Sequence, residues 1–94
     1  MSAYVVFQGD VEDLDGYERY KLLAAKSVEE HGGTYLVRGG SWISLEGEPP
    51  PSRNVIICFP TMEAAQSWYS SETYVQARPL RQAASTGALY VIEG

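Results

Sequence analysis

The stretch GGTYLVRGGSW, residues 32–42, contains the features on which the fold prediction depends. It sets a strand-like segment between two pairs of glycines. Gly32 and Gly33 follow a helix-like segment, and glycine readily takes the left-handed conformation that ends a helix. Gly39 and Gly40 interrupt the strand, which is typical of a β-bulge but would also let a ligand approach the backbone closely. The second pair does not lead into a helix, so a phosphate-binding loop is not predicted.

The segment before this stretch, residues 10–33, predicts a helix. Asp13 is the expected N-cap, because a short carboxylate there accepts hydrogen bonds from the amides of the first turn. Side chains at helical spacing mark the inner face of this helix: Tyr17, Tyr20, Ala24, Val28 and His31. Residues 3–8, AYVVFQ, are β-branched or aromatic and predict a preceding strand.

The rest of the chain completes the strand introduced above and supplies two more strands and a second helical region. Residues 34–46 predict one long strand broken at the glycine pair, and the proline-rich segment 47–52 predicts a turn. Residues 53–60 and 87–94 predict strands. Residues 61–85 predict one helix or two, with a break at Ser70-Ser71 or at Pro79. The order β-α-β-β-α-β is the ferredoxin-like split βαβ pattern, an α+β fold with a four-stranded antiparallel sheet and helices on one face. We expect one domain over residues 1–94.

Both faces of the predicted sheet are apolar. In strand 53–60, Val55 and Ile57 face one side, while Ile56 and Cys58 face the other. Apolar residues on both faces indicate that both are covered, yet the two helical regions can cover only one. The simplest cover for the second face is the same face of another copy, so we predict a homodimer that closes into an α/β barrel.

Composition excludes several classes of partner. The net charge is −5 and the seven Lys and Arg residues are scattered, so nucleic acid is not an expected partner. No apolar run approaches the roughly 18 residues that a membrane span needs. The single cysteine, Cys58, cannot form an internal disulfide, and no secretory signal is recognised, so we expect a cytoplasmic protein.

Seven blocks of sequence together resemble one family: AYVVFQGDVEDLDGYERY, HGGTYLVRGG, LEG, RNVIICFP, EAAQSWYSSETY, LRQAA and VIEG. They occur in the order found in the domain-of-unknown-function family 1330 (DUF1330), which belongs to the dimeric α/β-barrel superfamily. The resemblance implies a ferredoxin-like fold and a homodimer. It implies no settled activity, since the wider superfamily includes cofactor-free monooxygenases, isomerases, haem-binding enzymes and ligand-binding regulators.

Arg38 is the first candidate for ligand binding. A guanidinium presents a planar fork that matches a carboxylate, so Arg38 could hold an anion in a cleft between sheet and helices. The structural alternative is an ion pair with Glu46, Glu48 or a partner subunit. Tyr35 and Arg38 should point to opposite faces of the strand unless a bulge resets the register.

A second group of candidates lies in the second helical region: Trp68, Tyr69, Tyr74 and Arg81. Aromatic residues with an arginine could line a pocket for a planar acid or lactone. They could equally form the core or a dimer contact.

His31 is the only histidine and the candidate general base, because histidine is the residue type most often used to move protons in catalysis. The structural alternative is a helix C-terminal histidine that is hydrogen-bonded to backbone carbonyls. No second histidine or cysteine lies at metal-ligand spacing, so no metal site and no cofactor are expected. Asp10 is a weak candidate cleft carboxylate.

Two further interpretations are structural. Cys58 is expected to be a buried small hydrophobe. Glu46 and Arg53 are expected to pair across the prolyl turn.

Three functions remain open from the sequence. The first is a homodimer whose cleft binds a small aromatic or carbonyl-containing acid. The second is a cofactor-independent enzyme of the monooxygenase or isomerase type. The third is a purely structural dimer without a ligand.

Overall fold

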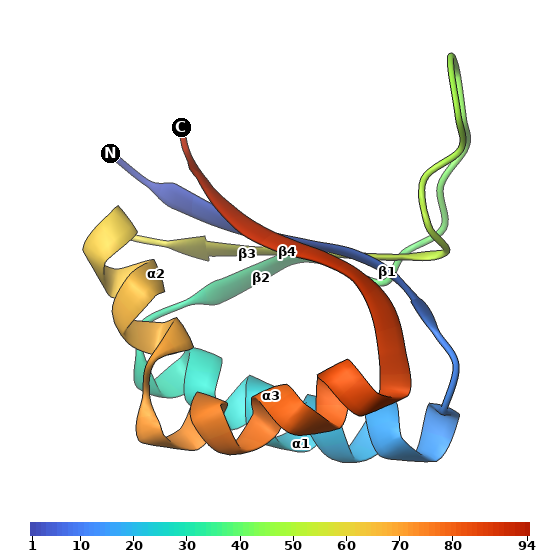
Figure 1. Cartoon of the computed structure of the whole chain (residues 1–94). Coiled ribbons are helices and arrows are strands. Elements are labelled where there is room, and N and C mark those ends of the chain that lie inside the picture. The colour runs from blue at the N-terminus through green and yellow to red at the C-terminus, as the bar shows by residue number, and fades with distance from the viewer.

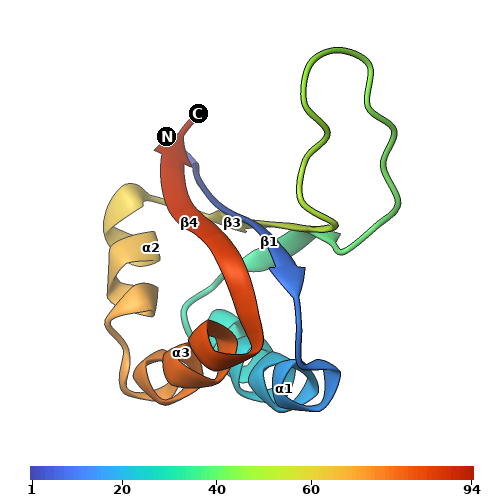
Figure 2. The ribbon, with the colours of Figure 1, turned by 45° about the vertical axis from the view of Figure 1, so that its right-hand side comes forward.

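The computed structural model describes all 94 residues and contains four strands and three helices. In chain order they are β1 (Ala3–Val11), α1 (Leu14–Glu30), β2 (Thr34–Arg38), β3 (Arg53–Phe59), α2 (Met62–Tyr69), α3 (Glu72–Ala84) and β4 (Ser85–Glu93). The strands form one antiparallel sheet in the order β2-β3-β1-β4. The helices all lie on one side of the sheet (Figure 1; Figure 2). This confirms the predicted ferredoxin-like α+β fold.

The helix boundaries follow from capping. Asp13 accepts a hydrogen bond from the Gly16 amide at 3.1 Å and is the N-cap of α1, as predicted. Thr61 and Ser71 cap α2 and α3 in the same way. The helical region therefore divides at Ser70-Ser71. Pro79 lies inside α3 without ending it.

The second strand is shorter than expected and its bulge lies elsewhere. β2 ends at Arg38, and residues 39–52 leave the sheet as a long exposed loop rather than continuing the strand. The register of β2 against β3 shifts between Tyr35 and Val37, so the bulge is at Leu36 and not at the glycine pair. Gly39 has φ +75°, and a Cβ there would meet the Arg53 guanidinium, so glycine is required where the chain turns out of the sheet.

The core fills the layer between the sheet and the helices. Fourteen buried apolar residues form one cluster, including Phe59, Trp68 and Tyr74 as its largest fully buried members. The Trp68 ring lies 4.1 Å from that of Tyr74 and 5.4 Å from that of Phe59, measured between ring centres. Its Nε1 donates to the hydroxyl of buried Ser27 at 2.9 Å, which satisfies the one polar atom of the indole.

The opposite face of the sheet has no cover within the chain (Figure 1). Register places mostly uncharged side chains on it: Tyr4, Val6, Gln8, Asn54, Ile56, Cys58, Ala88, Tyr90 and Ile92. The same alternation adds Thr86 and one charged residue, Asp10. Tyr90 and Ile92 are among the exposed large hydrophobic residues of the protein, and Cys58 is half-buried rather than buried. None of the three helices combines the length and apolar character that crossing a membrane requires.

Candidate functional site

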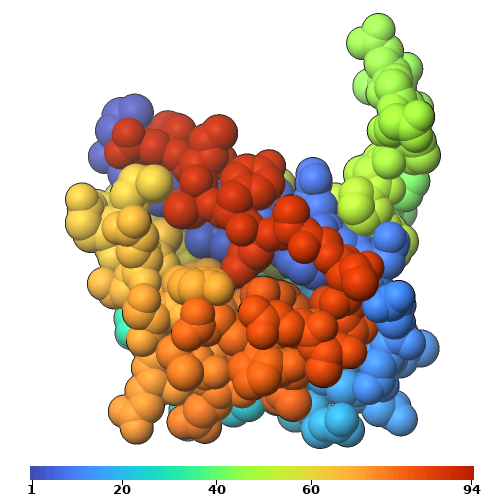
Figure 3. All heavy atoms as spheres, viewed as in Figure 1, coloured from blue at the N-terminus to red at the C-terminus, as the bar shows by residue number.

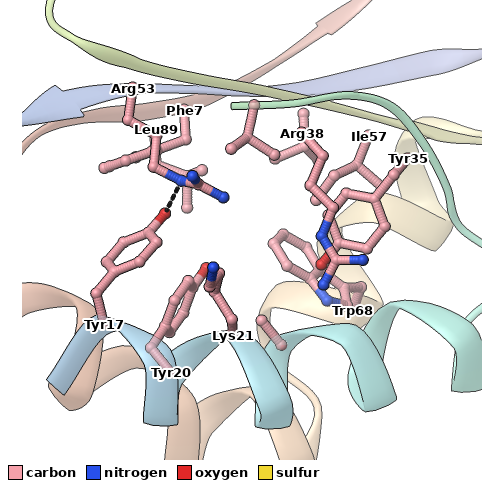
Figure 4. Close-up of a pocket in the computed structure, with 13 residues that line it drawn as sticks. Phe7, Tyr17, Tyr20, Lys21, Tyr35, Arg38, Arg53, Ile57, Trp68 and Leu89 are labelled. Carbon is pink, nitrogen blue, oxygen red and sulfur yellow. Dashed lines mark hydrogen bonds between the residues drawn. The ribbon is translucent and has the colours of Figure 1, made fainter. Parts of the chain in front are cut away.

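A narrow cleft lies between α1 and the inner face of the sheet (Figure 4). Ten of its thirteen lining residues are hydrophobic, and among them are Phe7, Val55, Ile57, Trp68 and Leu89. α1 contributes Tyr17, Tyr20 and Lys21, whereas β2 contributes Tyr35 and Arg38 and β3 contributes Arg53. The cleft is therefore an aromatic chamber with polar groups placed on three different elements.

Three cations and no carboxylate line this cleft. The Arg38 guanidinium carbon lies 4.4 Å from the centre of the Tyr35 ring, and that of Arg53 lies 5.0 Å from the Tyr17 ring. Arg53 Nε also donates to the Tyr17 hydroxyl at 3.0 Å. The only ion pair in the chain joins Lys21 to Glu18 on the surface of α1. Neither arginine is neutralised by a carboxylate, so the cleft has a positive potential in a protein of net charge −5.

A chain of three polar side chains leads from the interior to the cleft. Buried Arg81 donates from Nη1 to the Tyr74 hydroxyl at 2.6 Å. That hydroxyl lies 2.9 Å from the hydroxyl of Tyr20, which lines the cleft. Burial raises the pKa of Tyr20 and of Tyr74 above the usual phenol value, and it raises the pKa of Tyr35 to about 12. The cleft thus presents neutral phenols that can donate hydrogen bonds near neutral pH.

The cleft is nearly closed in this conformation. Its volume, taken as the space open to the centre of a water molecule, is about 20 Å³. That space holds a water molecule but is far below the several hundred Å³ of typical ligand pockets. A ligand could enter only if side chains at the mouth move, and exposed Arg38 is the long flexible side chain placed there.

A wider groove lies beside the cleft, between α2 and β4. Its volume on the same measure is about 400 Å³, and its walls include Gln66, Tyr69, Ser70 and Tyr90. Val5, Trp68 and Leu89 line both hollows, so these side chains separate the groove from the cleft. The Arg78 guanidinium carbon lies 4.4 Å from the centre of the Tyr69 ring, and interaction with Arg78 lowers the pKa of the Tyr69 phenol.

The structure distributes the predicted site residues over several places. Arg38 and Trp68 line the cleft, and Trp68 and Tyr69 line the groove. Tyr74 and Arg81 are buried behind the cleft and line neither hollow.

His31 also lies outside both hollows, and its Nδ1 is 2.9 Å from the Ser27 carbonyl oxygen. This contact matches the structural alternative for that residue, a helix C-terminal histidine bound to the backbone.

Other polar residues have different partners from those expected. Asp10 accepts hydrogen bonds from the Ser52 amide at 3.0 Å and from its hydroxyl at 2.9 Å, and these bonds hold the pKa of Asp10 below its usual value. Asp10 does not line the cleft. Arg53 binds Tyr17 and forms no ion pair with Glu46, so the predicted pairing across the turn was wrong. No group of three or more His, Cys, Asp or Glu side chains is placed to hold a metal ion.

The sequence reasoning missed four cleft residues: Tyr17, Tyr20, Lys21 and Arg53. Helical spacing had placed Tyr17 and Tyr20 on the inner face of the first helix, but inner-face tyrosines are usually core residues. The available signal was their hydroxyl groups, which need polar partners when buried.

Comparison with solved structures shows the same fold. The RPA0582 protein of unknown function from Rhodopseudomonas palustris superposes with a TM-score of 0.81 at 18% identity, over 99% of this chain and 82% of that one. SnoaB, a cofactor-independent oxygenase from Streptomyces nogalater, has a TM-score of 0.65 at 11% identity, over 99% and 92% of the two chains. A putative antibiotic biosynthesis monooxygenase from Nitrosomonas europaea has a TM-score of 0.60 at 17% identity, over 100% and 98%. At these identities the likeness establishes the fold alone.

Sequence comparison identifies the family. No curated protein matches this chain. Residues 2–94 match the family described as "Domain of unknown function (DUF1330)", and the chain therefore belongs to that family.

Proposed function

We propose that the cleft binds a small organic anion, namely an aromatic or carbonyl-containing acid. The observation that carries this proposal is the presence of Arg38 and Arg53, neither of them paired with a carboxylate, in an aromatic-walled cleft that Lys21 also lines. Arg38 is exposed and Arg53 is half-buried, and each stacks on a tyrosine without a carboxylate partner. Both guanidiniums therefore keep hydrogen-bond donors available for an anion.

The geometry also suits a planar ligand. A guanidinium fork binds a carboxylate through two parallel hydrogen bonds, and the aromatic walls offer faces on which a flat ring can stack. Arg81 can only donate hydrogen bonds, so the Tyr74 hydroxyl accepts from Arg81 and can donate its own hydrogen bond to the Tyr20 hydroxyl. In that arrangement the Tyr20 proton is left for an oxygen atom of the ligand.

A thermal-shift screen tests the proposal with aromatic acids, lactones, quinols and haem. We expect at least one acid to raise the melting temperature of the wild-type protein and to lose that effect in Arg38→Ala. Arg19→Ala removes the same charge from an exposed position on α1 and should keep the effect. A panel without any shift, or a shift that survives in Arg38→Ala, would count against the site.

The second candidate function is a cofactor-independent oxygenase or isomerase that acts on such a ligand. The fold shared with SnoaB supports it, as does Tyr20, whose hydroxyl is placed to donate to a developing oxyanion in the cleft. Oxygen uptake or isomerisation assays on any hit separate an enzyme from a binding protein. His31 remains a predicted base that lies outside the cleft, and full turnover in His31→Ala would exclude it.

The third candidate, a structural dimer without a ligand, is favoured by the small volume of the cleft. It predicts that the screen finds nothing and that Arg38→Ala melts like the wild type.

We also propose that the chain is a homodimer that packs through its uncovered sheet face. The support is the row of largely apolar side chains on that face, such as Val6, Ile56 and Ile92. Burying each large apolar side chain contributes about 1.5–3 kcal/mol before ordering costs. Sedimentation at low micromolar concentration should show a dimer, and a monomer there would contradict the proposal. The free thiol of Cys58 fits the further proposal of a cytoplasmic location.

A further inference from the structure

The loop formed by residues 39–52, called the arm below, stands away from the body of the protein (Figure 3). It contains three exposed large apolar side chains within four positions. Trp42 is 41% exposed, Ile43 is 82% exposed and Leu45 is 86% exposed. Single exposed apolar residues are ordinary, but a group of them on a projecting loop marks an interaction surface.

The base of the arm is fixed by hydrogen bonds. Asp10 on β1 accepts from both the amide and the hydroxyl of Ser52. Trp42 Nε1 donates to the Ser52 carbonyl at 3.2 Å, which joins the two limbs. Three consecutive prolines, residues 49–51, restrict the backbone of the returning limb. The arm is therefore held in one direction before any partner binds, which lowers the entropic cost of binding.

That direction is toward the side of the sheet that no helix covers (Figure 1). The arm rises at one end of the uncovered face, so the two surfaces meet at an angle. Any molecule seated on the face would have the arm along its flank.

The reach of the arm matches a second sheet. A fully extended chain spans about 3.3 Å per residue, so position 43 can lie at most about 13 Å from Gly39 and position 45 at most about 20 Å from it. Two sheets packed face to face lie about 10 Å apart. The arm is therefore long enough for Ile43 and Leu45 to reach the edge of a second sheet.

We propose that the arm clasps a second copy of this chain, with Ile43 and Leu45 packed on the flank of the partner. This inference rests on the proposed homodimer and adds the surface that fixes its geometry. A second copy is the occupant because the arm rises beside the same apolar face on which the second copy is proposed to sit, and a two-fold axis uses both surfaces twice. Each subunit then offers one arm and receives one arm.

Sedimentation equilibrium of the full chain tests this inference with the double variant Ile43→Ser/Leu45→Ser. We expect the dimer dissociation constant to rise at least about a hundredfold, because the two-fold axis removes four apolar contacts at once. Circular dichroism should stay unchanged, since the side chains of Ile43 and Leu45 are exposed and take no part in the hydrogen bonds that hold the base of the arm. The matched control is Leu22→Ser on α1, where the side chain is 78% exposed on the helical side. It should leave the dissociation constant unchanged.

A cross-linking experiment distinguishes the ways in which the inference can fail. Benzoylphenylalanine at position 43 should cross-link a chain carrying one tag to a chain carrying another. A wild-type dimer with no such cross-link, and an unchanged dissociation constant in the double variant, would overturn the role of the arm alone. A monomeric wild type would overturn the homodimer as well. Binding of the wild type, but not of the double variant, to phosphatidylcholine vesicles would assign the arm to a membrane surface instead and overturn the inference.

Discussion

The Arg38 guanidinium stacks on the ring of Tyr35, with 4.4 Å between its central carbon and the ring centre. Side chains alternate along a regular strand, so residues three apart point to opposite faces. The extra residue at Leu36 shifts the register and turns Arg38 to the inner face. The one irregularity of β2 thus places the arginine in the cleft, next to the tyrosine.

The stability of the protein should fall at alkaline pH because of its buried phenols. The folded-state pKa of Tyr35 is raised from 10.0 to about 12, and those of Tyr20 and Tyr74 move the same way. Above pH 10.0 the folded state holds a proton that the unfolded state has lost. The contribution of Tyr35 to the free energy of unfolding is therefore fully present below pH 10.0 and is lost as the pH rises toward 12. Urea unfolding between pH 9 and 12 should show a shallower decline in Tyr35→Phe. Tyr90→Phe removes an exposed phenol and should behave like the wild type; an equal decline in all three proteins would contradict this.

Tyr74→Phe should destabilise the protein by about 1–3 kcal/mol, because it leaves a donor of buried Arg81 without its acceptor. Urea unfolding near neutral pH measures this directly. Tyr69→Phe removes a hydroxyl from a partly exposed ring and should change the free energy of unfolding by less than about 0.5 kcal/mol. Equal stabilities for the two variants would show that the Arg81–Tyr74 bond contributes nothing.

Tyr20→Phe should weaken binding of any acid found in the screen about fivefold, the equivalent of one neutral hydrogen bond of about 1 kcal/mol. The aromatic wall is preserved, and the variant loses the donor to the ligand together with the internal hydrogen bond to Tyr74. Isothermal titration of the two proteins with the same acid gives the comparison. Undiminished affinity would mean that the Tyr20 proton does not reach the ligand.

Gly39→Ala and Gly40→Ala should differ sharply although they are adjacent. Gly39 has φ +75° and a Cβ there would meet the Arg53 guanidinium, whereas a Cβ on Gly40 meets nothing within 4 Å. The left-handed conformation costs an alanine about 1–2 kcal/mol, and displacement of Arg53 should also weaken anion binding. Thermal unfolding and the ligand screen on both variants provide the test; a Gly40→Ala variant as unstable as Gly39→Ala would refute the assignment.

Much of the fold followed from local sequence. Asp13, Thr61 and Ser71 cap helices because their side chains accept amide protons, and this chemistry depends only on nearby residues. Pro79 was a possible helix break that did not occur. The carbonyl that it leaves without a partner belongs to Val75, an exposed residue where water can replace the lost bond.

The site was less predictable because it depends on contacts between distant segments. Arg53 was expected to pair with nearby Glu46, but it binds Tyr17, thirty-six positions away. The bulge was assigned to the conspicuous glycine pair, yet it occurs at Leu36, a residue type with no turn preference. Only the pairing of β2 with β3 decides which residue of a strand is the extra one.

The central claim, that Arg38 and Arg53 bind an organic anion in the cleft, is tested most directly by titration with benzoate observed by NMR. The Nε–H resonances of the arginine side chains report separately on each guanidinium. We predict saturable shifts for Arg38 and Arg53 with one common dissociation constant, and none for Arg78, which stacks on Tyr69 away from the cleft. Shifts that increase linearly without saturation, or that are equal at Arg78, would contradict a binding site in the cleft.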